Sequence, residues 1–180
     1  NIILIIFDAR MFTLKRPAFI SLFCTTILLL FVKQLPLAQN SSTAFDRAAY
    51  YTAFSSDNIN TIQKQLDILR GESQTQKDAF EGALMMKKAG LLKGAAHKLK
   101  EFKAGREKLE NMITKYTGNA EFRFLRLMVQ EKAPKILGYD KQLEDDHTYV
   151  VEHFKSVPEA VKKAILDYSK SSKVLSPADF

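Results

Sequence analysis

Residues 99–129 are the stretch that decides the fold, and they read LKEFKAGREKLENMITKYTGNAEFRFLRLMV. From Leu99 to Tyr116 an apolar side chain recurs every three or four residues, with Arg106 as the one polar interruption. This period predicts an amphipathic helix. Gly118 is expected to end that helix and Asn119 to cap the next one. The second helix is apolar around most of its circumference, which predicts that it is central and buried.

The same period extends the helical prediction to both sides of this stretch. We expect further helices over residues 43–54, 57–70, 75–92, 143–154 and 157–168. The sequence has no β-hairpin signal and no Gly-rich strand-to-helix turn, which disfavours α/β folds. Short connections place consecutive helices antiparallel. The sequence therefore predicts an all-α domain of six or seven antiparallel helices, arranged as helical hairpins or as an irregular bundle.

The first 38 residues have the features of an export signal. Lys15 and Arg16 follow Met11, the expected start, and precede an apolar run over residues 18–32. Leu35 and Ala38 fill the −3 and −1 positions of a cleavage site, so we expect removal after Ala38 and an exported protein, periplasmic or on the cell surface. The alternative is an inner-membrane anchor through residues 18–32, although a bilayer span needs about 20 apolar residues.

These signals divide the chain into four parts. Residues 1–38 are the N-terminal extension and signal segment, and 39–56 are a leader with a possible first helix. Residues 57–170 are the all-α domain, and 171–180 are expected to be a frayed tail. The only cysteine is Cys24, so cleavage would leave a chain without disulfides, thiolate metal sites or cysteine nucleophiles. The first part carries +3 of the net +7, which leaves a mildly basic +4.

A polar stripe interrupts the apolar helix after Asn119. It consists of Arg123, Arg126 and Gln130, and a buried guanidinium must be paired with an acid. The acids near enough in sequence are Asp140, Asp145 and Asp146. We predict a structural clasp that holds the following loop and includes Arg123, Arg126, Gln130, Tyr139 and Asp140. The alternative is a ligand site in a pocket between helices, lined by Arg123, Arg126, Tyr139 and His147.

Basic residues gather between positions 87 and 108. They are Lys87, Lys88, Lys93, Lys98, Lys100, Lys103, Arg106 and Lys108. Glu101 and Glu107 are the only acids in this stretch. Such a patch is typical of a solvated helix face or of a surface that contacts an anionic envelope component. Aromatic residues that would stack on bases are not interleaved with it, so nucleic acid is not an expected partner.

One spacing is typical of di-iron helical bundles. Glu144 and His147 form a Glu-x-x-His pair, but His97 and His153 have Gly94 and Val150 at the matching position. A full site needs two such pairs, so we predict neither a metal nor a cofactor. No Ser-His-Asp order, phosphate loop or catalytic carboxylate pair stands out, and we predict no catalytic residues.

Two segments resemble known families. Residues 109–121, LENMITKYTGNAE, resemble the junction between tetratricopeptide repeats, with Gly105, Leu109 and Met112 at the small and large positions of a second helix. Residues 119–139 resemble a run in uncharacterised, exported, all-helical proteins of the Bacteroidetes. The first resemblance implies helical hairpins. The second implies an exported helical fold, and it assigns no activity to this chain.

Two functional hypotheses follow. The first is a non-catalytic module that binds a protein partner or scaffolds an envelope assembly, since helix pairs with short loops occur here without a catalytic constellation. The second is a small-ligand carrier or an enzyme that uses a pocket between the helices. The sequence favours the first hypothesis and leaves the oligomeric state open.

Overall fold

The computed structural model describes residues 45–73 and 75–180, and in this part of the chain it contains helices and no β-strand. The seven α-helices are α2 (Arg47–Ser55), α3 (Ile59–Gly71), α4 (Lys77–Leu91), α5 (Ala95–Lys115), α6 (Ala120–Lys132), α7 (Leu143–His153) and α8 (Glu159–Ser169). Three short 3-10 turns are η2 (Lys135–Leu137), η3 (Phe154–Ser156) and η4 (Pro177–Asp179). The prediction of an all-α fold is confirmed. The predicted signal segment lies outside the described residues.

Side-chain caps begin three of the helices. Asp46 accepts a hydrogen bond from the Ala49 amide, and Asn58 caps α3 in the same way. Asn119 accepts from the Phe122 amide at 3.1 Å, which confirms its predicted role at the start of α6. Each cap satisfies amide donors that have no partner inside the helix. None of the helices in the described residues has both the length and the apolar character needed to cross a bilayer.

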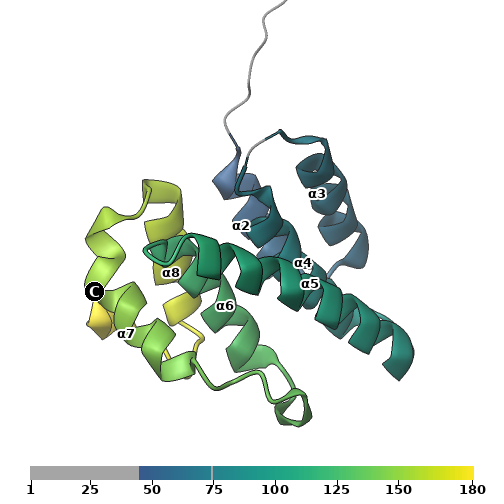
Figure 1. Ribbon diagram of the computed structural model, residues 1–180. Coiled ribbons are helices and arrows are strands. Elements are labelled where there is room, and N and C mark those ends of the chain that lie inside the picture. The colour runs from purple at the N-terminus through teal and green to yellow at the C-terminus, as the bar shows by residue number, and fades with distance from the viewer. Residues whose placement is uncertain (1–44, 74) are drawn as a thin grey trace, which may run out of the picture. The chain divides into compact units, whose positions relative to one another are not determined.

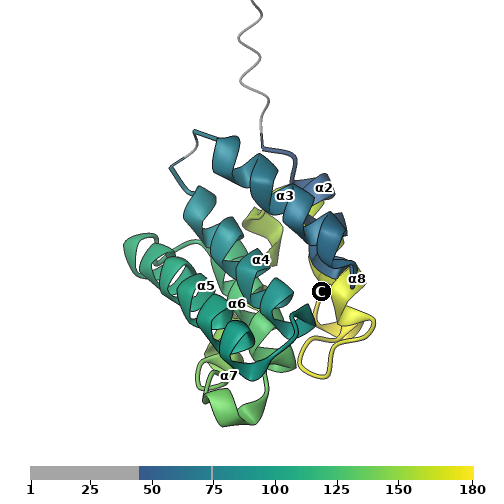
Figure 2. The ribbon, with the colours of Figure 1, turned by 90° about the vertical axis from the view of Figure 1, so that its right-hand side faces the viewer.

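Helices α4 and α5 form an antiparallel hairpin, and Figures 1 and 2 show them lying side by side. Lys88 near the end of α4 pairs with Glu101 near the start of α5. Asp78 at the start of α4 pairs with Lys108, further along α5. The two helices therefore run in opposite directions. The turn between them contains Gly94 at φ +82°, a conformation that favours glycine.

Two glycines bring the backbones of this hairpin together. A Cβ added at Gly82 would lie 2.5 Å from the carbonyl oxygen of Gly105, and a Cβ at Gly105 would lie 2.5 Å from the carbonyl oxygen of Gly82. Both obstacles are backbone atoms, which cannot rotate away. The backbones of α4 and α5 therefore approach each other closely at this point, and neither position has room for a larger side chain.

Helix α6 is the centre of the domain. Phe122, Phe124, Leu125 and Leu127 are fully buried, as the apolar circumference of this helix predicts. It contacts α4, α5 and α7, and Figure 1 shows α7 and α8 on the side away from α3. Helix α8 packs on α2, so the last helix lies beside the first described one.

The C-terminal residues 171–180 are folded against α6 and α7, where we expected a frayed tail. The carboxylate of Glu131 on α6 accepts hydrogen bonds from the Ser172 hydroxyl and the Lys173 amide. Leu175 is buried, and Phe180 packs on Phe154 with ring centroids 4.5 Å apart. These partners lie on helices and turns earlier in the chain, so local sequence does not indicate that the segment is folded.

Candidate functional site

A large apolar groove lies on the domain formed by the described residues. It has a volume of about 1410 Å³ and lies among α2, the end of α4, the start of α5, the second half of α6, η2 and α8. Its floor contains the buried side chains of Phe54, Met86, Phe102, Met128 and Val129. Helices far apart in sequence supply these side chains, so no local pattern indicates the groove.

Two large apolar side chains at the edge of the groove are exposed to solvent. Ile136, in η2, is 94% exposed, and Leu99, in the first turns of α5, is 40% exposed. Met86 and Met128 also line the groove, and methionine side chains adapt to irregular partners. An exposed apolar edge beside an apolar floor is typical of a surface that binds another molecule.

Lysines from four helices line the groove. Lys87 on α4 pairs with Asp57 at 2.8 Å, and Lys163 on α8 pairs with Asp167 at 2.5 Å. Lys98 on α5 donates to the carbonyl oxygen of Gly90 at 3.0 Å. The fourth is Lys132, at the end of α6. Its ammonium pairs at 3.2 Å with Glu131, which is not a lining residue.

The predicted polar stripe of α6 lies away from the groove, in a buried cluster that we call the arginine clasp. Its members are Arg123, Arg126, Glu110, Asp146 and Tyr139. Arg126 donates from Nε and Nη2 to the two oxygens of Asp146, both at 2.7 Å. Its Nη1 donates to Glu110 at 2.9 Å. The side chains of Arg126 and Asp146 are 7% and 0% exposed, so the pair is shielded from water.

In the arginine clasp each carboxylate faces a guanidinium, although the buried Nε of Arg123 has no hydrogen-bond partner among the described residues. Burial alone would lower the pKa of Arg126, but Asp146 and Glu110 outweigh it and raise that pKa above its ordinary value. Burial, and then the Glu110 carboxylate, raise the pKa of the Tyr139 hydroxyl well above its usual range. That hydroxyl donates to Glu110 at 2.6 Å. Two guanidinium groups therefore face two carboxylates, with Tyr139 as a permanent donor.

Arg123 and Gln130 have weaker contacts than Arg126. Arg123 donates to Asp146 at 3.2 Å, and its guanidinium lies 4.4 Å from the centroid of the Tyr149 ring. Gln130 is buried and reaches Gln142 at 3.5 Å, the limit of a hydrogen bond. Arg123 therefore joins α6 to α7, and Gln130 joins α6 to Gln142 in the turn just before α7.

Of the three acids that the sequence offered as candidates, Asp146 is a partner in the arginine clasp and Asp140 is not. Asp140 is exposed and makes no ion pair with the described residues. Asp146 takes its place because α7 runs antiparallel to α6 and brings Asp146 opposite Arg126. Glu110 on α5 was not predicted. No spacing along the chain links Glu110 to Arg126. Arg106, one turn earlier on α5, has its guanidinium 4.8 Å from the Tyr139 ring centroid.

His147 does not join Arg123 and Arg126 in a ligand pocket. Its Nε2 lies 3.5 Å from the Asp179 carboxylate in η4. Glu144, the other half of the Glu-x-x-His spacing, is exposed. Across residues 45–73 and 75–180, no three potential ligand side chains gather into a group that could hold a metal ion.

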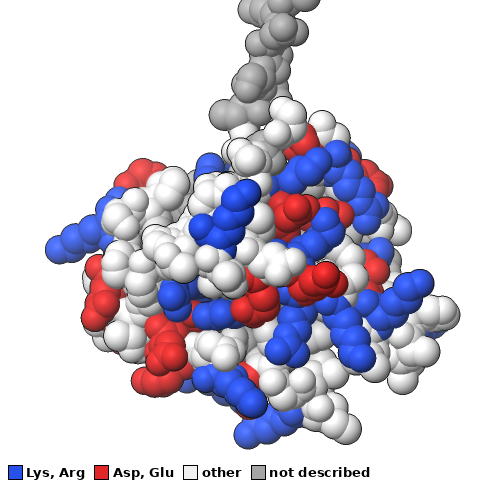
Figure 3. Space-filling model, in the orientation of Figure 1, with Lys and Arg blue, Asp and Glu red and all other residues white. Residues whose placement is uncertain are grey.

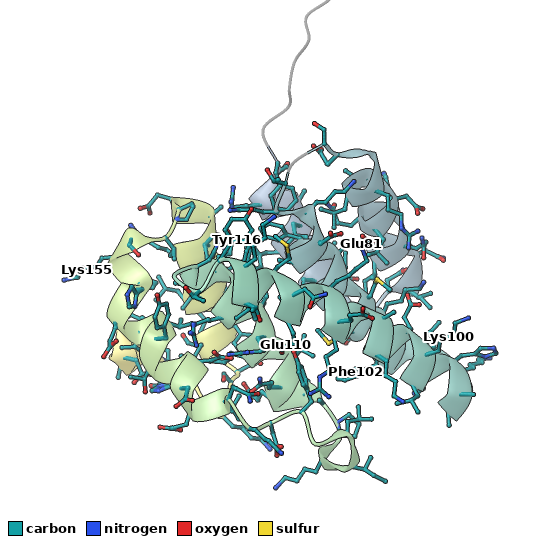
Figure 4. All side chains as sticks on the ribbon, in the orientation of Figure 1. Glu81, Lys100, Phe102, Glu110, Tyr116 and Lys155 are labelled. Atoms are coloured by element: carbon teal, nitrogen blue, oxygen red, sulfur yellow. The ribbon has the colours of Figure 1, made fainter. Side chains whose placement is uncertain are left out.

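The basic stretch 87–108 separates into paired and unpaired residues. Lys87, Lys88 and Lys108 form ion pairs with acids of the domain. The other lysines, Lys93, Lys98, Lys100 and Lys103, are exposed and have no acidic partner among the described residues. Figure 3 shows basic side chains over the first turns of α5, and Figure 4 shows Lys100 projecting from that end of the helix.

No protein-family model, curated protein or solved structure matches this chain. The resemblances to tetratricopeptide repeats and to exported Bacteroidetes proteins therefore stay predictions, and the groove itself is the basis for a function.

Proposed function

We propose that this chain is a non-catalytic interaction module whose groove binds an amphipathic helix of a protein partner. The observation that carries the proposal is the groove itself, an open apolar channel of about 1410 Å³. Its edge includes Ile136, an isoleucine that no packing within the described domain covers. Helix-in-groove binding uses such a surface, with apolar side chains every three or four residues of the partner.

The size of the groove favours a helix over a small molecule. Small-ligand pockets measure about 300–1000 Å³. A helix with its side chains is roughly 10–12 Å across and rises about 1.5 Å per residue, so each residue fills roughly 120–170 Å³. A volume of about 1410 Å³ therefore corresponds to roughly eight to twelve helical residues, or two to three turns.

The polar groups support a binding role rather than catalysis. Within residues 45–73 and 75–180, the lining of the groove includes neither histidine nor glutamate. Its two acids, Asp57 and Asp167, are engaged with lysines. The arginine clasp, where acids and bases do meet, is closed on itself and holds α5, α6 and α7 together.

We further propose that the module acts outside the cytoplasm, as part of an envelope assembly. The basic segment before residues 18–32, the apolar run and the Leu35 and Ala38 spacing support an export signal. Retention of the run as an inner-membrane anchor would place the same module at the membrane surface. Mass spectrometry of the native protein distinguishes a cleaved signal from a retained anchor. Cleavage gives an N-terminus near Gln39, whereas an anchored protein begins at Met11.

The function can be tested with a fluorescent amphipathic peptide of three helical turns, with leucines on one face and glutamines on the other. Fluorescence anisotropy should show saturable binding to the full chain. Ile136→Asp should weaken it about tenfold, because a buried isoleucine contributes roughly 1.5–3 kcal/mol and 1.4 kcal/mol is tenfold. Ile68→Asp is the matched control, since Ile68 on α3 is 48% exposed and does not line the groove.

Two outcomes contradict the proposal. Absence of binding rejects it, and so does binding that Ile136→Asp and Ile68→Asp weaken equally. If a fatty-acid probe binds in a manner that depends on Ile136 while the peptide does not, the groove belongs to a small-ligand carrier instead.

A further inference from the structure

We infer that the helix recognised by the groove is acidic, with aspartate or glutamate side chains flanking its apolar face. This inference rests on the proposed function, and it names the chemistry of the partner. It is carried by the lysines around the groove, which outnumber the acids four to two. A partner helix seated on the apolar floor would place its flanking residues next to these lysines.

The four lysines are distributed around the groove rather than gathered on one wall. Lys87, Lys98, Lys132 and Lys163 come from α4, α5, α6 and α8 respectively. A helix lying in the groove therefore has lysines on more than one side. Such an arrangement suits a partner with acids on both flanks of its apolar stripe, because each flank then meets a cation.

Two of these lysines can approach an acidic side chain of a partner without breaking a buried ion pair. Lys98 is bound to a carbonyl oxygen, which leaves its positive charge uncompensated by an acid. Lys132 is 59% exposed, and its acid Glu131 is also held by Ser172, Lys173 and Tyr168. The pairs Lys87–Asp57 and Lys163–Asp167 each include a largely exposed member. Exposed pairs of this kind are weak and rearrange easily.

Helix ends reduce this excess of positive charge but do not remove it. Helices α2, α4 and α6 all end at the groove, and α5 begins there. Each helix C-terminus adds roughly half a negative charge, and each N-terminus roughly half a positive charge. The two ion-pair partners just outside the lining, Glu131 beside Lys132 and Lys170 beside Asp167, cancel each other, so the side chains keep a surplus of two positive charges. The helix ends reduce this surplus to about one, which still favours an acidic partner.

The charge effect should be modest and sensitive to salt. Exposed ion pairs contribute little each, so two or three of them should change affinity about three- to tenfold. The Debye length is about 10 Å at 0.1 M salt and about 3 Å at 1 M, so the preference should fade as salt rises. The preference for an acidic helix should appear mainly in the association rate, because complementary charge speeds the encounter of the two molecules.

The test compares three peptides that share one leucine face and carry glutamate, glutamine or lysine on the flanks. At 50 mM salt the full chain should bind them in that order of affinity, with about three- to tenfold between glutamate and glutamine. At 1 M salt the three affinities should converge. The double variant Lys98→Glu/Lys132→Glu should remove or reverse the order. Lys100→Glu/Lys103→Glu is the matched control, since it makes the same charge change on α5 outside the groove.

The results separate the inference from the proposed function. Equal binding of all three peptides at 50 mM salt overturns the inference and leaves the groove function intact. An equal response of the groove and control variants also overturns it, since net charge alone would then explain the order. If none of the peptides binds, the function fails and the inference fails with it.

Discussion

Helix α6 has one face in the arginine clasp and another in the groove, and the two regions treat polar and apolar groups in opposite ways. In the clasp, Arg126 is buried and held by bonds of 2.7 Å to Asp146. In the groove, Met128 and Val129 lie on the floor of an open channel, and Lys132 is at its edge. Charged side chains are buried and paired at the clasp face of α6, while apolar side chains line an open groove at the other face.

The comparison separates structural groups from binding groups. A buried ion pair contributes little net free energy relative to apolar packing, but removal of one member leaves an unpaired charge. Its role is therefore to hold α5, α6 and α7 in one arrangement. An uncovered apolar edge such as Ile136 does nothing for folding, so a binding role accounts for it better.

The largest expected effect is at the centre of the clasp. Arg126→Ala leaves the fully buried carboxylate of Asp146 with only the longer bond from Arg123, and should lower the free energy of unfolding by about 3–5 kcal/mol. Arg126→Lys should recover little of this loss, because an ammonium cannot form the two parallel bonds to Asp146. Urea denaturation at pH 7 measures both. A loss below about 1 kcal/mol for Arg126→Ala would show that the clasp is not structural.

A smaller effect is expected at Glu131, where α6 holds the C-terminal segment. Burial alone would raise the pKa of Glu131, but hydrogen bonds from Ser172, Lys173 and Tyr168 outweigh it and lower that pKa. The ionised group therefore stabilises the fold above its ordinary pKa, and the benefit is lost as pH falls through the lowered value. Glu131→Gln should cost about 1.5–3 kcal/mol at pH 7, the range for a hydrogen bond to a charged group.

Urea denaturation of wild type and Glu131→Gln at several pH values tests this dependence. The gap between the two proteins should narrow as the solution is acidified below the ordinary glutamate range. Glu159→Gln is a control, since that carboxylate is 87% exposed at the start of α8. A gap that stays constant from pH 7 into acid would show that Glu131 does not act through its charge.

The smallest effects on stability are expected at the groove. Ile136→Asp and Lys98→Glu should each change the free energy of unfolding by less than about 0.5 kcal/mol, because both side chains are exposed. Lys103→Glu, on the outer side of α5, should be equally mild. Loss of peptide binding by Ile136→Asp with unchanged urea denaturation would sharpen the comparison. A large loss of stability would break it, because the groove edge would then be part of the folded core.

The sequence predicted the helices and part of the clasp, but not the groove. The three- and four-residue spacing from Leu99 to Tyr116 is a local signal, and it led to α5. The polarity of Arg126 on an apolar helix indicated a buried acidic partner, and Asp146 was among the three candidate acids, although Asp140 was the one included in the predicted clasp. Glu110 and the groove depend on how α5, α6 and α8 pack together, and no spacing along the chain records that arrangement.

The glycine contact between α4 and α5 bears on how the protein reaches its fold. Gly82 and Gly105 lie in consecutive helices, so their contact closes a shorter stretch of chain than the contact of α8 with α2. Contacts between nearby residues lose less entropy on closure and speed folding. We therefore expect this hairpin in the folding nucleus, with α8 docking on α2 later. A side chain at either glycine would then slow folding more than it speeds unfolding.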